Sequence, residues 1–86
     1  MYEVELRRIA VKSLDKLKDP DYSRIIAALS KIEQEPRPKG VEKLRGTELW
    51  RVREGDYRII YHIDDDSKKV TVVRLGHRRD VYRGIQ

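Results

Sequence analysis

Apolar residues recur with two different periods along the chain, and the change of period predicts its elements. Residues 2–6 alternate apolar and acidic side chains, which indicates a short strand. Residues 8–18 and 20–35 instead repeat apolar side chains at the spacing of one helix face; Asp19 is a favourable N-cap for the second helix, and Pro20 a favourable first residue. The apolar residues of that second helix, which we expect to face the core, are Tyr22, Ile25, Ile26, Leu29 and Ile32.

The C-terminal half of the chain returns to the alternation of β-strands. Residues 49–53 and 57–63 flank a two-residue turn that includes Gly55, which predicts a hairpin. A third strand is expected over residues 69–77, which are rich in β-branched side chains. Residues 36–46, ahead of the hairpin, are expected to form a basic, turn-rich connection.

The order of these segments predicts one small α+β domain over residues 1–86. We expect a β-α-α-β-β-β arrangement, with a mostly antiparallel four-stranded sheet and an N-terminal helical hairpin packed on one face. A chain of 86 residues buries one modest core, which fits a single domain. After the last strand, the basic C-terminal segment is expected to be irregular or one helical turn.

The predicted hairpin separates arginine from apolar side chains. Because strand side chains alternate between faces, Arg51, Arg53 and Arg58 share one face, on which one arginine lies directly opposite another. We call this the arginine face. Like charges that oppose each other across a ladder are destabilising, so the cluster favours an anionic ligand, and the guanidinium fork suits phosphate. The other face is expected to pack on the helices and carries Trp50, Val52, Tyr57 and Ile59.

Composition narrows the classes of partner. The net charge of +5 and the pI of about 9.6 favour nucleic acid, an acidic membrane surface or an acidic protein. The chain has no cysteine and two histidines, so we expect no disulfide, no metal site and no cofactor. No apolar run approaches the roughly 20 residues that cross a bilayer, and the N-terminus lacks the pattern of a signal peptide. A cytoplasmic location is therefore expected.

The segment after the third strand can bring His77, Arg78 and Tyr82 near the arginine face. Histidine titrates near neutrality, and tyrosine can stack on a base or donate a proton. Such a set suits cleavage of an RNA phosphodiester, in which the 2′-hydroxyl attacks the phosphorus and no metal is required. Taken singly, each residue also has a structural explanation: a solvated arginine, a capping histidine, or a tyrosine that packs the C-terminus.

The ordered series resembles the RelE family of the RelE/ParE superfamily, the toxins of bacterial and archaeal toxin–antitoxin pairs. The resemblance covers nearly the whole chain and implies the fold predicted above. It also implies a ribosome-dependent endoribonuclease that cuts mRNA in the ribosomal A site and so inhibits translation. The implied partner is a small acidic antitoxin, similar to RelB, that holds the toxin inactive in a hetero-oligomer. No association with a membrane is implied. The matching stretches are residues 35–38, 43–46, 49–53, 55–61 and 76–82.

The same resemblance implies roles for individual residues. Arg51 and Arg53 are expected to contact and orient mRNA, and Arg58 to help stabilise the transition state. Arg78 is expected to bind near the scissile phosphate, and Tyr82 to stack on or position the nucleotide. The expected catalytic set is Arg58, His77, Arg78 and Tyr82. The expected RNA-binding set is Lys43, Arg45, Arg51, Arg53 and Arg79.

The chain departs from the best-known pattern by carrying arginine, in place of lysine, at positions 51 and 53. Arginine, with a pKa above about 12, is a poor general base, so we expect His77 or Tyr82 to take a larger share of proton transfer. Two other functions stay open: a ParE-like toxin that binds DNA gyrase without nuclease activity, and an inactive RelE-like module that binds nucleic acid or antitoxin. The combination of Arg58, Arg78 and Tyr82 favours the nuclease, because a gyrase-directed toxin does not need it.

Overall fold

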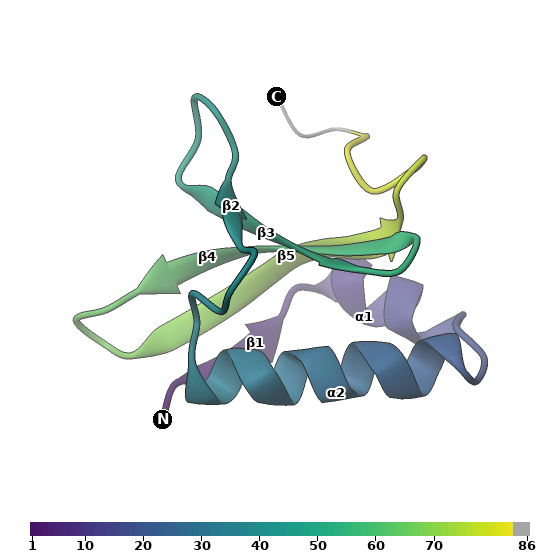
Figure 1. Cartoon of the computed structure of the whole chain (residues 1–86), viewed down its shortest axis with the longest axis horizontal. Helices are drawn as coiled ribbons and strands as arrows, with labels where there is room; N and C mark the ends of the chain where they lie inside the picture. Colours follow the sequence, from purple (N-terminus) through teal and green to yellow (C-terminus); the bar gives the residue numbers. More distant parts are fainter. Residues whose placement is uncertain (84–86) are drawn as a thin grey trace.

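The structure, a computed structural model, describes residues 1–83 of the chain. The strands form one sheet, and both helices lie on the same face of it (Figure 1). The elements in chain order are β1 (Glu3–Leu6), α1 (Arg8–Asp15), α2 (Asp21–Gln34), β2 (Glu42–Lys43), β3 (Leu49–Glu54), β4 (Tyr57–Asp64) and β5 (Lys69–His77). This order and layering confirm the predicted α+β fold with its N-terminal helical hairpin.

The sheet is mixed and has five strands in the order β1-β5-β4-β3-β2. Strands β2 to β5 are antiparallel neighbours, whereas β1 runs parallel to β5. The predicted count of four strands is wrong because β2 lies within the connection expected over residues 36–46. This strand has only two residues, both exposed, so no alternation in the sequence marks it. It forms because the chain turns back along β3.

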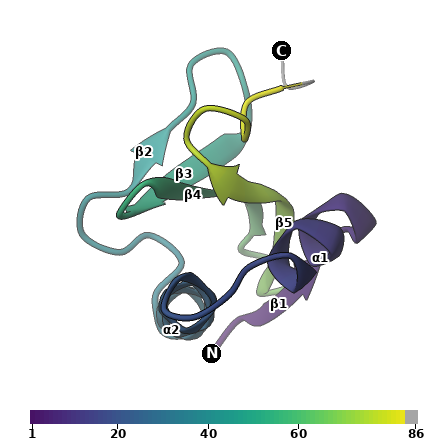
Figure 2. The ribbon, with the colours of Figure 1, turned by 90° about the vertical axis from the view of Figure 1, so that its right-hand side faces the viewer.

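Both helices lie beneath the sheet, and their limits differ slightly from the predicted ones (Figures 1 and 2). α1 ends at Asp15, three residues before the expected end. Asp19 caps the next helix from outside it, because its carboxylate accepts hydrogen bonds from the backbone N–H and the hydroxyl of Ser23 at 3.2 and 2.6 Å. Within residues 1–83, neither helix is long and apolar enough to cross a membrane.

The core lies between the helices and the sheet. Ile59, Tyr61 and Ile63 of β4 point into it, and the Tyr61 hydroxyl donates to the Pro36 carbonyl at 2.6 Å. Burial raises the pKa of Tyr61, since water no longer solvates a phenolate there. The remaining buried members of the core are Ala10, Ile25, Ala28, Ile32, Val70, Val72 and Leu75.

The predicted apolar stripe of α2 is only partly buried. Ile25 and Ile32 are fully buried, but Tyr22 and Ile26 are 40% and 38% exposed. The helix also buries the small side chain of Ala28. The buried face of α2 is therefore narrower than the apolar stripe of its sequence.

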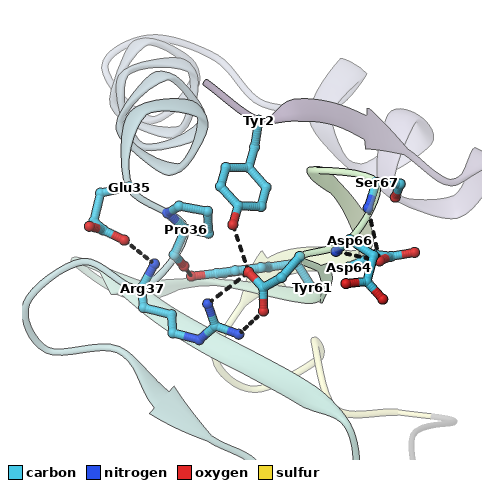
Figure 3. Close-up of polar contacts among 9 residues, drawn as sticks. Tyr2, Glu35, Pro36, Arg37, Tyr61, Asp64, Asp66 and Ser67 are labelled. Atoms are coloured by element: carbon cyan, nitrogen blue, oxygen red, sulfur yellow. Dashed lines mark hydrogen bonds and ion pairs between the residues drawn. The ribbon is translucent and has the colours of Figure 1, made fainter.

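A cluster that we call the N-terminal clamp joins three distant segments at one end of the sheet (Figure 3). Arg37 donates two hydrogen bonds to the Asp65 carboxylate, at 3.2 and 2.9 Å, and the Tyr2 hydroxyl donates to the same carboxylate at 2.6 Å. Arg37 and Tyr2 thereby lower the pKa of Asp65 to about 2, and the carboxylate raises the pKa of Tyr2. The Arg37 guanidinium also lies 5.0 Å from the centre of the Trp50 ring.

Candidate functional site: an arginine face closed by a C-terminal tyrosine

The β3–β4 hairpin places the arginines as predicted. Glu54 pairs with Tyr57, so the turn is Gly55-Asp56, and Gly55 adopts a φ of +60° that suits glycine. Arg53 lies directly opposite Arg58 in this register. Arg51 lies opposite Ile60, so the three arginines share the sheet face away from the helices. The predicted arginine face is therefore confirmed as a feature of the fold.

Strand β5 extends this face with residues that the sequence analysis did not assign to it. Gly76 lies opposite Arg58, and Arg74 lies opposite Ile60. The register passes from Ile60–Arg74 to Tyr61–Val72, which leaves Val73 as an extra residue, a β-bulge. Beyond a bulge the alternation of side chains changes face, so Arg74 and Gly76 point away from the helices.

Arg51 is more enclosed than Arg53. Its Nη1 donates to the Tyr82 hydroxyl at 2.9 Å, and its Nη2 pairs with Oε1 of Glu42. Only 18% of its side chain is exposed, and its buried Nε has no hydrogen-bond partner within the described part of the chain. Arg53, by contrast, is 62% exposed, and its Nη2 lies 3.8 Å from the same Glu42 oxygen.

Arg58 and Arg78 are both attached to the hairpin turn. The Nη1 of Arg58 donates to the carbonyls of Gly55 and Tyr57, each at 2.9 Å. The backbone N–H of Arg78 donates to the Asp56 carbonyl at 2.8 Å, and its Nε lies 4.0 Å from the Asp56 carboxylate. The turn therefore brings an arginine from β4 together with an arginine from the C-terminal segment.

A short turn after β5 carries Tyr82 to Arg51. The backbone N–H groups of Asp80 and Val81 donate to the His77 carbonyl at 2.9 and 3.0 Å. Both views show this segment on the sheet face opposite the helices (Figures 1 and 2). Val81 and Ile60 are 4% and 0% exposed although neither belongs to the main core, so the segment covers part of the arginine face.

His77 is not brought to this cluster. It pairs with Tyr57, whose ring packs on the core, so the imidazole lies on the helix side of the sheet. The two rings meet edge to face, with centroids 5.8 Å apart. Its Nδ1 accepts the Arg79 backbone N–H at 3.2 Å, and a hollow of about 400 Å³ beside it is also lined by Asp21 and Arg24. The sequence-based expectation overlooked the Val73 bulge, which moves residue 77 to the opposite face.

The other expected RNA-binding residues lie around the cluster. Lys43 lies opposite Trp50, on the helix side, with its Nζ 5.9 Å from the Trp50 ring and 3.8 Å from the Glu48 carboxylate. Arg45 is exposed in the loop between β2 and β3, which rises on the same side as the C-terminal segment (Figure 1). Arg79 is also exposed.

Glu42 is not among the residues expected from the sequence, yet it lies within the site. Its position in β2, opposite Arg51, places a carboxylate between two arginines of β3. No periodic pattern could reveal this, since β2 is too short to show one. Within residues 1–83, no group of three histidine, aspartate or glutamate side chains is placed to hold a metal ion.

Known proteins with similar sequences and folds are toxins. The curated toxin RelG of Mycobacterium tuberculosis (strain ATCC 25618 / H37Rv) is 33% identical, in an alignment that covers 95% of this chain and 97% of RelG. The archaeal RelE–RelB complex of Pyrococcus horikoshii OT3 contains a chain with a TM-score of 0.80 and 34% identity, matched over 93% of this chain and 98% of that one.

A second solved structure is the toxin–antitoxin complex RelBE2 of Mycobacterium tuberculosis, with a TM-score of 0.78 and 29% identity over 90% of this chain and 98% of that chain. A sequence model of the family described as "ParE toxin of type II toxin-antitoxin system, parDE" matches residues 4–82. This match spans both helices, the whole sheet and the segment that carries Tyr82. The chain therefore belongs to this toxin family, within the RelE/ParE superfamily, and is a RelE-like toxin of the type II toxin–antitoxin class.

Proposed function

We propose that this chain is a ribosome-dependent endoribonuclease that cuts mRNA in the A site and thereby inhibits translation. One observation carries the proposal: the Tyr82 phenol is hydrogen-bonded to Arg51 on the same face as Arg53 and Arg58. A tyrosine far from these arginines would have left a basic surface without a proton carrier. The same arrangement places Arg78 at the adjoining turn.

In the proposed reaction, the 2′-hydroxyl attacks the adjacent phosphorus and the bond to the 5′-oxygen breaks. The products are a 2′,3′-cyclic phosphate and a 5′-hydroxyl, so the 2′-oxygen loses a proton and the 5′-oxygen gains one. Arginine side chains neutralise the negative charge that grows on the phosphoryl oxygens. No metal or cofactor takes part in this scheme.

Tyr82 is the proposed proton carrier. Its oxygen accepts a hydrogen bond from Arg51, so its own O–H stays free to donate. Arginine cannot fill this role because its pKa is too high. A share for His77, which lies on the other face, stays a prediction: the rate and pH profile of a His77→Ala variant would change if the imidazole takes part.

We further propose that a small acidic antitoxin similar to RelB binds and inhibits this protein in a cytoplasmic hetero-oligomer. The net charge of +5 favours an acidic partner. The solved relatives from Pyrococcus horikoshii and Mycobacterium tuberculosis are toxin–antitoxin complexes, which supports the same arrangement.

Induced expression with primer-extension mapping of transcripts tests the nuclease. We expect cuts in phase with codons for the wild type and none for Arg78→Ala. Arg83→Ala is the matched control, since Arg83 is an arginine of the same segment with an 83% exposed side chain, and it should cut normally. Growth arrest with loss of DNA supercoiling and intact mRNA would favour the gyrase-binding alternative and overturn the proposal.

A further inference from the structure

We infer that Glu42 and Arg51 are positioning residues that hold the Tyr82 phenol, and that phosphate contact on the arginine face falls to Arg53, Arg58 and Arg78. The inference rests on the nuclease proposed above. The family resemblance implies that Arg51 is an RNA ligand. In the inferred arrangement, Arg51 instead links Glu42 to Tyr82.

Both terminal nitrogens of Arg51 already have a side-chain partner. Its Nη1 donates to the Tyr82 hydroxyl, its Nη2 pairs with the Glu42 carboxylate, and its Nε is buried. A phosphate would compete with both partners for this guanidinium, because only 18% of the side chain is exposed. The side chains of Arg53 and Arg78 are 62% and 56% exposed, so they can reach an incoming phosphate without such displacement.

Glu42 fixes the direction of the Arg51 fork. The two residues are direct neighbours across β2 and β3, so the ion pair follows from the strand register. A guanidinium is planar, and a carboxylate held at one nitrogen orients the other nitrogen toward Tyr82. Lysine, a point charge on a flexible stem, lacks this geometry, which explains the value of arginine at position 51 in this chain.

The first experiment counts phosphate contacts through the salt dependence of binding to a short single-stranded RNA. Each phosphate contact contributes about 0.7 to the slope of log K against log salt. The charge-neutral double variant Glu42→Gln/Arg51→Gln should keep the wild-type slope, whereas Arg53→Gln should lower it by about 0.7. Arg51 is a phosphate ligand, and the inference is overturned, if the double variant loses as much slope as Arg53→Gln.

Cleavage on ribosomes gives the matching kinetic readout. Glu42→Gln should lower kcat on the order of tenfold with little change in KM, because a misplaced phenol affects the chemical step. Glu48→Gln is the matched control. This substitution also removes one negative charge, but from an ion pair with Lys43, which lies on the helix side of the sheet. The opposite result is a Glu42→Gln variant that binds RNA more tightly than Glu48→Gln and keeps its kcat. It would show that the carboxylate merely occupies a position where phosphate can bind, and it would overturn the inference.

A third measurement needs no RNA. With carbon-13 in the tyrosine rings, Glu42→Gln and Arg51→Gln should both shift the Tyr82 signal, which a Tyr82→Phe variant identifies, and Glu48→Gln should not. An unmoved Tyr82 signal overturns the inference even if the nuclease is active. Absence of RNA binding and cleavage by the wild type would refute the proposed function alone, since the tyrosine signal would still decide the positioning roles.

Discussion

The N-terminal clamp and the Tyr82 cluster, as we call the group formed by Glu42, Arg51 and Tyr82, contain the same three kinds of side chain in opposite arrangements. In the clamp the carboxylate is central: Asp65 accepts from both Arg37 and the Tyr2 hydroxyl. In the other cluster the guanidinium is central: Arg51 donates to the Tyr82 hydroxyl and pairs with Glu42. The central group decides the use of the phenol.

A phenol that donates to a carboxylate has committed its proton, and the raised pKa of Tyr2 expresses this. A phenol that accepts from arginine keeps its proton available. The charges differ as well, because Asp65 neutralises Arg37 whereas Arg53 and Arg58 add positive charge to the sheet face that carries Arg51. The clamp is therefore suited to holding the fold together, and the Tyr82 cluster to acting on an anion.

Removal of the two phenol oxygens should separate these roles most strongly. We expect Tyr82→Phe to lower mRNA cleavage by about 100-fold or more, since positioned acid–base groups contribute that much, with an unchanged Tm. Tyr2→Phe should cleave normally and melt at a lower temperature. Primer extension and thermal melts of both variants measure the contrast, and equal losses of activity would remove the distinction.

A side chain at position 76 should obstruct the arginine face and leave the N-terminal clamp intact. Gly76 lies opposite Arg58, and a Cβ added there meets nothing within 4 Å. Gly76→Leu should therefore fold but reduce cleavage by roughly tenfold, because it occupies space beside Arg58. His62→Leu, at an exposed position of β4, is the control and should cleave normally. Normal cleavage by Gly76→Leu would mean that RNA does not approach the sheet surface beside Arg58.

Much of this site could be predicted from the hairpin, and the reasons are local. The alternation over residues 49–63 and the turn at Gly55 determined which residues face each other, including Arg53 and Arg58. Two features depend on distant parts of the chain instead. The Val73 bulge arises from pairing between β4 and β5, and β2 exists only where β3 is available to pair with it.

Those two features account for the misplaced histidine and the missed carboxylate. Without the bulge, alternation carries residue 77 onto the arginine face, which is what the sequence alone indicates. Glu42 resembles any exposed acid until β2 sets it beside Arg51. Single-residue changes of register and short edge strands leave no periodic trace, so the sequence could not show them.

Loss of the clamp should lower stability and leave cleavage intact. Arg37→Gln removes the paired hydrogen bonds to Asp65 and the contact with Trp50. We expect a fall of a few degrees in Tm, since the pair is partly exposed, and full nuclease activity. Arg83→Gln, which breaks an ion pair of exposed partners, is the control and should melt like the wild type. A loss of cleavage in Arg37→Gln would link the two clusters.

The smallest expected effect is the pH dependence of the clamp. The folded-state pKa of Asp65 is lowered to about 2, so its contribution is present above the unfolded value of about 4 and is lost as the pH falls toward 2. The raised pKa of Tyr2 acts in the opposite sense, because its contribution is present below pH 10 and is lost above it. Urea midpoints across pH should decline at both ends, and Asp65→Asn should flatten both declines.

The extra residue in β5 also suggests how such a site changes between relatives. Deletion of Val73 would remove the bulge and leave Leu75 and His77 on their present faces, whereas one residue inserted after Arg74 and paired regularly would turn Leu75 toward water and His77 toward the arginines. An imidazole could then join the phosphate-facing side through the gain of one codon. Substitution alone would need several coordinated steps for the same exchange, so strand length is a second variable on which selection can act.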